Sequence, residues 1–253
     1  MPLDGLNQLD RSPAGLLGKD ASKRPTPQMP ATVLQLAAEA PVEVCRGLLP
    51  PALHPLNPGV LVIMAYQVAA TAERASFRTV EVAVQCRAGA RARRYVLGAA
   101  VDDPRVAADL EARWGYLSAA AEIRLDRRYE RIDLTVAAGG NTVLRASLLG
   151  PEPVTPAAVL YVAGLRPVIA GGQPWIAQFE RAFEISRADR GRPVVSELDS
   201  EWWTSGQTAG LAATEPISGS FTRADVTLNP TRFLIAPGRS RAADTRRLAD
   251  VTG

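Results

Sequence analysis

The sequence predicts an α+β fold built on a large, mainly antiparallel sheet or barrel with few helices. Short apolar or alternating runs of strand length recur from residue 59 to residue 227. Few helical patterns separate these runs, so antiparallel pairing through short loops fits better than βαβ units. Neither a Ser/Gly linker nor an internal repeat interrupts residues 31–237, which predicts one domain there. Residues 1–30, polar and Pro-rich, are expected to form an irregular arm, and residues 238–253 an Arg-rich tail that is a short helix or a frayed end.

Two segments carry the clearest strand patterns. Gly59–Tyr66 is almost continuously apolar, as in a strand buried on both faces, and Phe77–Cys86 alternates between apolar and polar residues. Two later runs flank Gly139-Gly140-Asn141 and predict a hairpin around that turn. The further strand candidates are Tyr95–Val101, Ile132–Val136, Thr142–Leu148, Ala158–Leu165, Phe179–Ile185 and Ser218–Thr227.

The clearest helix spans Pro104–Trp114. Asp103 is a favourable N-cap, Pro104 suits the first helical position, and Gly115 suits the position just after the helix. An apolar residue recurs every fourth position and predicts a buried stripe. The stripe consists of Val106, Leu110 and Trp114.

Residue composition excludes several kinds of catalytic site. His54 is the single histidine, and both lysines, Lys19 and Lys23, lie near the N-terminus. A Ser-His-Asp triad or a two-His metal site is therefore not expected, and residues 24–253 hold no lysine to form an imine. No phosphate loop, dinucleotide fingerprint or metal cluster is present in the sequence. We expect no cofactor and no metal.

The distribution of charge and hydropathy excludes two classes of partner. The formal net charge of +3 comes from residues 1–24 and 238–253, which leaves the body of the chain neutral, so no nucleic-acid partner is expected. No run of 18 apolar residues predicts a membrane span, and the N-terminal segment lacks the apolar core of a secretory signal. We expect a cytoplasmic protein whose partner is a small molecule.

The segment Glu111–Ala119 follows a predicted strand and helix and reads Glu-Ala-Arg-Trp-Gly-Tyr-Leu-Ser-Ala. It resembles the acetoacetate decarboxylase family, in which Gly-Arg-Glu is followed by Trp-Gly-Phe-Pro-Lys-Lys. Phe77–Cys86 resembles that family's aromatic-x-Glu-Val strand, and Gly219–Leu228 resembles its closing strand. In order and spacing the resemblance covers Val33–Leu234. It implies a cone-shaped antiparallel barrel with a central pocket, and a homo-oligomer.

The same resemblance implies that the family's reaction is lost. The imine-forming lysine falls on Ser118 and its neighbouring lysine on Ala119, while the pocket carboxylates fall on Thr79 and, in a looser alignment, on Val62. Of Gly-Arg-Glu only Glu111 remains. Imine catalysis requires an amine that is neutral near pH 7, so this chain is not expected to be a functional acetoacetate decarboxylase.

Three residues are candidates for catalysis. Strand parity places Glu81 on the same face as Thr79, so it is expected to point into the barrel, where a carboxylate without a cation has a raised pKa and acts as a general acid or base. The alternative is a solvent-facing glutamate. Tyr116 and Ser118, in the loop of the resemblance, are candidate hydrogen-bond donors to a carbonyl or enolate, although Tyr116 could also serve only in packing.

Five further residues are candidates for contact with the substrate. Glu111 could instead hold the following loop, and Trp114 could belong to the core. Trp202 and Trp203 are expected to be adjacent strand residues that face opposite sides, so at most one of them lines a cavity. The five substrate-binding candidates are Thr79, Val62, Glu111, Trp114 and Met64.

Two functions from different classes remain open. The first is an enzyme that works without an imine, enclosing a polyketide-like or β-dicarbonyl molecule and promoting a cyclisation, enolisation, dehydration or lyase step in secondary metabolism. The second is a non-catalytic protein that binds a small ligand; a decarboxylase or aldolase that uses another amine is a third and weaker alternative. A buried carboxylate facing Tyr116 favours the enzyme, and a wholly apolar pocket favours the binding protein.

Overall fold

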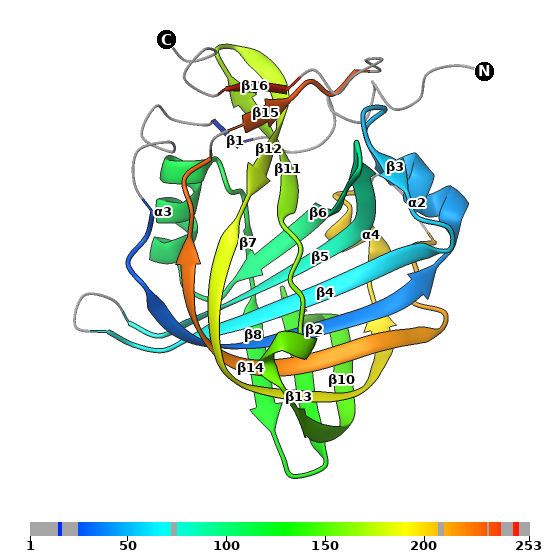
Figure 1. Cartoon of the computed structure of the whole chain (residues 1–253), viewed down its shortest axis with the longest axis vertical. Coiled ribbons are helices and arrows are strands. Elements are labelled where there is room, and N and C mark those ends of the chain that lie inside the picture. Colours follow the sequence, from blue (N-terminus) through cyan, green and yellow to red (C-terminus); the bar gives the residue numbers. More distant parts are fainter. Residues whose placement is uncertain are drawn as a thin grey trace.

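The chain folds into one long sheet that coils into a barrel, with helices at its sides (Figure 1). The computed structural model describes residues 15–16, 25–71, 75–206, 210–231, 233–238 and 245–247. Over these residues the strands lie in the order β16-β15-β12-β11-β6-β5-β4-β2-β14-β13-β10-β9-β8, with β1, β3 and β7 attached to β11, β5 and β6. Nearly all pairs are antiparallel; β1–β11, β11–β6 and β6–β7 are parallel.

The strands in the first part of the described chain are β1 (Gly15–Leu16), β2 (Met29–Ala40), β3 (His54–Pro55), β4 (Gly59–Val68), β5 (Phe77–Ala88), β6 (Arg91–Val101), β7 (Ala119–Ala120), β8 (Glu122–Arg127) and β9 (Arg131–Ala138). The others are β10 (Asn141–Val154), β11 (Gly164–Ala170), β12 (Gln173–Phe179), β13 (Arg181–Leu198), β14 (Pro216–Leu228), β15 (Phe233–Ile235) and β16 (Thr245–Arg247). The helices are α2 (Val42–Leu48), α3 (Pro104–Trp114), α4 (Ser200–Trp203) and the 3₁₀ turn η2 (Pro156–Ala158). Within the described ranges, no helix has the length and apolar character needed to cross a bilayer.

The predicted fold class is confirmed, and so are the elements with the strongest local patterns. Helix α3 has the predicted ends: the Asp103 side chain accepts a hydrogen bond from the Arg105 N–H, and Gly115 adopts the left-handed conformation with φ 60°. Strands β4 and β5 cover the two strongest runs, and β9 and β10 form the predicted hairpin around Gly139 and Gly140.

Other predictions were incomplete or wrong. Strand β2 was missed because it is rich in alanine and carries a glutamate, both unfavourable in strands, although β14 and β4 pair with it on both sides. Most of the predicted strand Ala158–Leu165 is irregular, and the strand predicted at Phe179–Ile185 is divided between β12 and β13. In the tail, Thr245–Arg247 is a strand rather than a helix. Most of the expected N-terminal arm and the rest of the tail lie outside the described residues.

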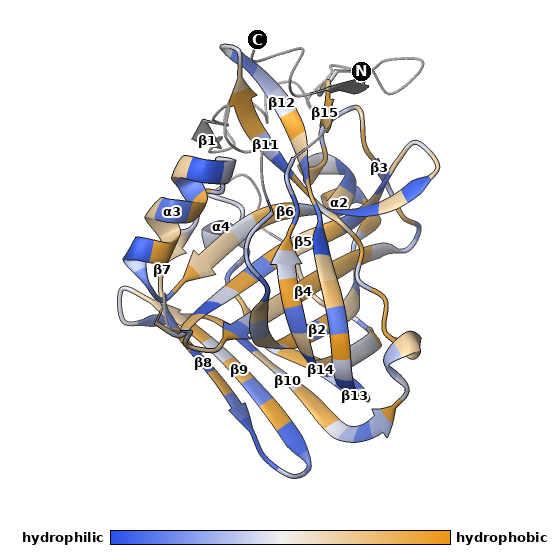
Figure 2. Cartoon of the chain, turned by 60° about the vertical axis from the view of Figure 1, so that its left-hand side comes forward, coloured by the Kyte–Doolittle hydropathy of each residue, from blue (hydrophilic) through white to orange (hydrophobic). Residues whose placement is uncertain are grey.

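The central strands are buried on both faces. A polar or charged side chain on either face of these strands is therefore unusual. Val80, Val82 and Val84 of β5 pack in a large apolar core with Ile132 and Leu134 of β9. The opposite face of the same strands packs in a second core with α3. Figure 2 shows this arrangement, with hydrophobic residues concentrated on the central strands. A charged side chain on the second face of β5 is therefore enclosed by protein.

Candidate active site

Glu81 is the charged residue that β5 places on that enclosed face. Glu81 is 1% exposed, and in the antiparallel register it lies opposite Met64 of β4 and Ala99 of β6. Directly opposed residues point to the same side of a sheet, so Glu81 points away from Val80 and Val82 and toward the second core. A carboxylate this deeply buried requires charged partners or hydrogen bonds.

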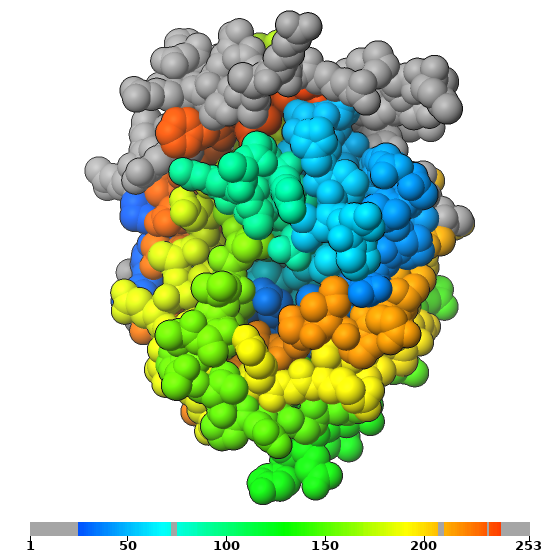
Figure 3. All heavy atoms as spheres, turned by 45° about the vertical axis from the view of Figure 1, so that its right-hand side comes forward, coloured from blue at the N-terminus to red at the C-terminus, as the bar shows by residue number. Residues whose placement is uncertain are grey.

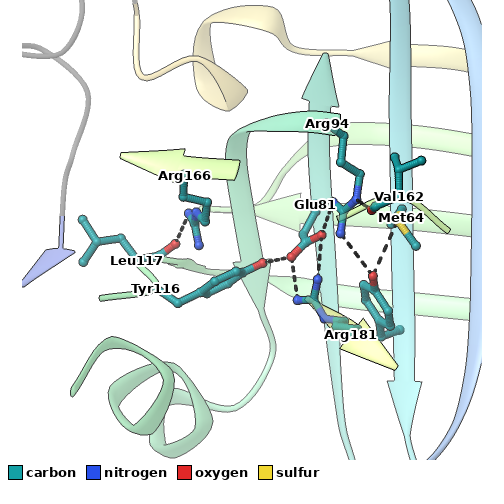
Figure 4. A network of polar contacts seen from close by, with 9 residues as sticks. Met64, Glu81, Arg94, Tyr116, Leu117, Val162, Arg166 and Arg181 are labelled. Atoms are coloured by element: carbon teal, nitrogen blue, oxygen red, sulfur yellow. Dashed lines mark hydrogen bonds and ion pairs between the residues drawn. The ribbon is translucent and has the colours of Figure 1, made fainter. Parts of the chain in front are cut away.

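Glu81 has three direct partners, from three different elements (Figure 4). Arg94 of β6 forms an ion pair with Glu81 Oε2 and is itself 2% exposed. Arg181, the first residue of β13, places Nη2 2.8 Å from Glu81 Oε1 and Nη1 3.4 Å from Oε2. The hydroxyl of Tyr116 donates a hydrogen bond to Oε1. The carboxylate therefore holds together strands β5, β6 and β13 and the loop after α3.

A second layer of contacts surrounds these partners. Arg94 Nη2 donates to the hydroxyl of Tyr66 at 3.4 Å, and the guanidinium of Arg181 lies 4.7 Å from the centre of the Tyr66 ring. On the other side, Arg166 of β11 stacks on Tyr116, with its guanidinium carbon 3.7 Å from the ring centre. Cations over aromatic rings gain electrostatic attraction in a desolvated setting. Arg94 and Arg181 thus contact the carboxylate directly, and Arg166 lies beyond Tyr116; Arg94 and Arg166 are buried, whereas the side chain of Arg181 is 14% exposed.

Burial by itself would raise the pKa of Glu81, but the charges of Arg181 and Arg94 outweigh it and hold the pKa far below its usual range. The expectation of a raised pKa was therefore wrong, because it assumed a pocket without cations. Burial, and then the charge of Glu81, raises the pKa of the Tyr116 hydroxyl. Both tyrosines near Glu81 stay protonated donors at neutral pH, since burial also raises the pKa of Tyr66.

Local sequence explains how Tyr116 reaches Glu81. Gly115 ends α3 in the left-handed conformation that glycine adopts without steric cost. The next residue turns back, and the Tyr116 N–H donates to the carbonyl of Leu110 at 3.2 Å. Its ring then packs edge-on against Phe179, with centroids 5.8 Å apart. The helix end and this packing hold the hydroxyl against Glu81.

A small cavity lies beside the cluster. Its volume is about 60 Å³, and its walls include Met64, Tyr66, Arg94 and Arg181, with the exposed Glu180 at the rim. That is about twice the volume of one water molecule in the liquid. The cavity therefore has room for a small polar group next to the two arginines.

The segment 159–163 covers this cavity. The hydroxyls of Tyr161 and Thr222 lie 2.7 Å apart, and Gln35 Nε2 donates to the Leu160 carbonyl at 3.5 Å. Burial raises the pKa of Tyr161 to about 12, so its phenol also stays protonated. On the face shown in Figure 3, a hollow lies between the yellow-green, yellow and orange segments, with blue atoms at its bottom. Side-chain hydrogen bonds, including one from Arg94 Nε to the Val162 carbonyl, hold most of this irregular part of the cavity wall in place.

Of the predicted site residues, the structure brings Glu81, Tyr116 and Met64 together. Thr79 and Val62 are buried on the same face as Glu81, with 6% and 5% of their surface exposed. They line neither this cavity nor a second cavity that lies beside Ser118. Trp114 belongs to the core under α3. Glu111 is exposed, and its backbone carbonyl, not its carboxylate, accepts the hydrogen bond from Gly115. Its predicted contact with substrate is not supported.

Ser118 lies in a different place from Glu81. It lines a second cavity of about 250 Å³, between β6, β11 and α4, and its buried Oγ has no hydrogen-bond partner among the described residues. Both Trp202 and Trp203 line this cavity. The expectation that they face opposite sides was wrong, because they lie on a helix and not a strand. Among the described residues, no cluster of His, Cys, Asp and Glu is arranged to hold a metal ion.

Arg94, Arg166 and Arg181 were not predicted as site residues. Arg94 stands at the end of the run Arg91-Ala-Arg-Arg, directly before the strand predicted from Tyr95. The strand in fact begins at Arg91, and its parity turns Arg94 inward, paired with Gln85 in register. Arg94 could have been identified as a site residue if the predicted strand had been extended by four residues toward the N-terminus. No local pattern marks Arg181.

The depressed pKa of Glu81 predicts an acid-dependent loss of stability. The carboxyl has a reference pKa of 4.5 and a far lower pKa when folded, so its contribution is complete above about pH 5 and is lost as the pH falls below that. The expected slope approaches 1.4 kcal/mol per pH unit between about pH 4 and 2. Urea unfolding of the wild type and Glu81→Gln over this range measures it. The two curves should converge at low pH; parallel curves would contradict the assigned pKa.

Comparison with solved structures places this fold among known ones. Acetoacetate decarboxylase from Legionella pneumophila superposes with a TM-score of 0.70 at 16% identity, over 83% of this chain and 88% of that one. The enduracididine biosynthesis enzyme MppR superposes with a TM-score of 0.65 at 18% identity, over 81% and 87%. An acetoacetate decarboxylase-like enzyme from Sphingomonas wittichii superposes with a TM-score of 0.59 at 14% identity, over 81% of this chain and 91% of that one. At the level of sequence, the chain matches no family model and no curated protein. The chain therefore has the acetoacetate decarboxylase-like fold.

Proposed function

We propose that this chain is an enzyme that binds a small keto acid, or the acid end of a longer β-dicarbonyl compound, beside Glu81 and promotes an enolisation-type step without forming an imine. One observation carries this proposal: the buried carboxylate of Glu81 pairs with the buried Arg94 and the mostly buried Arg181, and a third arginine, Arg166, stacks on Tyr116 beside it. A cavity lined by Tyr66 and Tyr161 lies next to this cluster. Cyclisation, dehydration or a lyase step would follow from the enolate according to the substrate.

The charge balance defines the kind of ligand. Arg94, Arg166 and Arg181 bring three positive charges, and Glu81 brings one negative charge. Uncompensated buried charge is costly, so the cluster favours an additional anion. Arg94 and Arg181 both line the small cavity, and a guanidinium binds a carboxylate through paired N–H donors. A substrate carboxylate is the matching group.

Binding such an anion changes the chemistry of Glu81. In the free protein this carboxylate is a poor base, because Arg181 and Arg94 lower its pKa. A substrate carboxylate shares these arginines and adds a like charge, and both effects raise the pKa of Glu81. Glu81 does not line the cavity in the free protein, so the proposal requires the substrate carboxylate to draw Arg181 away from it; Glu81 then accepts the proton from the carbon next to the ketone. The hydroxyl of Tyr66 or Tyr161, both at the cavity, donates to the enolate oxygen.

The cavity size and the comparisons support a small keto acid. A volume of about 60 Å³ accommodates the acid group and a few atoms, and a larger substrate displaces the segment 159–163. MppR has been solved with pyruvate and with the condensation product of pyruvate and imidazole 4-carboxaldehyde. An enzyme with this fold therefore accommodates a keto acid, which is consistent with a tailoring or biosynthetic role for this chain.

Hydrogen–deuterium exchange tests the function. In D₂O, the chain should accelerate exchange of the methyl protons of pyruvate or the C2 protons of acetoacetate, as followed by NMR. Tyr66→Phe removes one hydrogen-bond donor and should slow exchange about tenfold. Tyr129 is 95% exposed, so Tyr129→Phe serves as the control and should leave the exchange rate unchanged. Borohydride added during the reaction should leave the mass of peptides from residues 24–253 unchanged, because these residues contain no lysine.

The outcomes separate the candidate functions. Saturable binding without exchange would identify a non-catalytic binding protein. A borohydride-stabilised adduct within residues 24–253 would overturn the imine-free mechanism. Absence of binding by either keto acid would overturn the proposal.

A further inference from the structure

Strand β8 lies at one end of the sheet and pairs only with β9 among the described strands. Figure 2 shows it at the outer edge of its layer, coloured mostly as hydrophilic. An edge strand presents unpaired backbone donors and acceptors that another strand can use. The side chains of β8 therefore determine whether a second strand can pair with this edge.

The hydrogen-bond alternation shows which groups face outward. The Arg128 N–H donates to the Arg131 carbonyl at 2.7 Å, so this pair belongs to the bonded set of the β8–β9 ladder. In an antiparallel ladder, alternate residues bond to the partner. The N–H and C=O groups of Ile123, Leu125 and Arg127 therefore point away from β9, toward the free edge.

The charges along this strand are self-complementary. Residues 122–128 read Glu-Ile-Arg-Leu-Asp-Arg-Arg, and reversal about Leu125 places Arg124 opposite Asp126 and Glu122 opposite Arg128. All four alternate on the outer face and are exposed. Within the chain Asp126 lies opposite Asp133, a like charge. An arginine on the free side of Asp126 would offset that repulsion.

A third feature lies at the end of the strand. Among the described residues, Tyr129 is the most exposed of the large hydrophobic residues, at 95%. Tyr129 lies in the turn between β8 and β9, beyond the last paired residue of β8, and at the other end of the strand Ala121 lines an open groove of about 370 Å³ together with Arg78 and Asp102. An exposed aromatic ring gains stability when such a groove receives it.

We propose that two copies of this chain associate through antiparallel pairing of β8 with β8 of the partner subunit, centred on Leu125. Leu125 then pairs with the same leucine of the partner subunit, at a hydrogen-bonded position of the new ladder. Arg124 and Asp126 form two symmetric cross-strand ion pairs in the closer, non-bonded positions. A twofold axis makes this interface self-complementary and closed, and the two sheets become one continuous sheet. The interface is separate from the Glu81 site.

Charge reversal and its rescue test the interface. Sedimentation velocity over a concentration series should show a monomer–dimer equilibrium for the wild type. Arg124→Asp places like charges opposite each other twice and should weaken the dimer by about tenfold or more. The double variant Arg124→Asp/Asp126→Arg restores both pairs with unchanged composition and should restore the dimer. Arg105→Asp, at an exposed position on α3, is the matched control and should have no effect.

A cysteine at the twofold axis tests the register. Leu125→Cys should form a disulfide-linked dimer under mild oxidation, whereas Ile123→Cys, which meets Arg127 of the partner subunit, should not. Circular dichroism verifies that each variant is folded. A monomer at every concentration, or a dimer that Arg124→Asp leaves intact, would overturn the proposal. Equal cross-linking of both cysteine variants would overturn the register.

Discussion

Glu81→Gln is expected to lower the free energy of unfolding by about 3–5 kcal/mol, because it removes the one carboxylate that compensates the buried arginines around it. The amide has nearly the same size, so packing is preserved and the effect is electrostatic. For a chain of this length, that loss corresponds to a fall in melting temperature of about 10 °C. Thermal and urea unfolding at pH 7 measure it.

Glu111→Gln provides the matched control for this change. Glu111 is exposed on α3, and its substitution should alter stability by less than about 0.5 kcal/mol. If Glu81→Gln were equally mild, the arginines would have to be neutralised in another way, and the described electrostatic cluster would be wrong. A lower Tm that is regained when an anionic ligand is added would further indicate that the cluster accepts a second anion.

Local patterns were sufficient to predict the elements that frame the site. The cap residues of α3 define both of its ends, and they place the turn at Gly115 from which Tyr116 reaches inward. Alternation along β5 predicted that Glu81 shares a face with Thr79, away from Val80 and Val82. Both inferences depend on contacts within about ten residues, where helix and strand geometry is set by the sequence itself.

The ionisation of Glu81 could not be predicted in the same way, because its partners come from distant parts of the chain. Arg94 is 13 residues away and Arg181 is 100 residues away, and only the sheet order brings β6 and β13 near β5. A pattern of hydropathy does not distinguish a buried arginine at a strand end from a solvated one. The chemistry assigned to a buried carboxylate therefore requires the tertiary fold, even when its burial is predictable.

Ser118 illustrates a related limit. Resemblance placed it at the position of a nucleophile, yet here it lines the cavity beside α4 rather than the one beside Glu81. The guanidinium of Arg166 stacks on Tyr116, lines that same cavity, and donates through Nη2 to the Leu117 carbonyl at 2.5 Å. A motif position thus predicted the loop, and the side chains around it determine which cavity the loop residues face.

Arg181→Met is expected to abolish most of the affinity for a keto acid while leaving the fold nearly intact. Glu81 keeps its ion pair with Arg94, and the excess of positive charge falls, so the stability should decrease by less than it does in Glu81→Gln. Removal of one charged donor from a buried carboxylate complex costs roughly 2–5 kcal/mol, or at least about 30-fold in Kd. Calorimetric titration with acetoacetate and pyruvate measures the loss.

Arg187→Met separates this effect from a general loss of positive charge. Arg187 lies on the same strand and pairs with Asp189 at 3.3 Å, far along β13 from the cavity residues, and Asp189 retains Arg127 at 3.0 Å. Its substitution should leave keto-acid affinity unchanged. Equal losses in the two variants would mean that the anion is attracted by the overall charge of the strand. Loss in Arg181→Met alone places the substrate carboxylate at the small cavity beside the Glu81 cluster, because Arg181 lines that cavity and Arg187 does not.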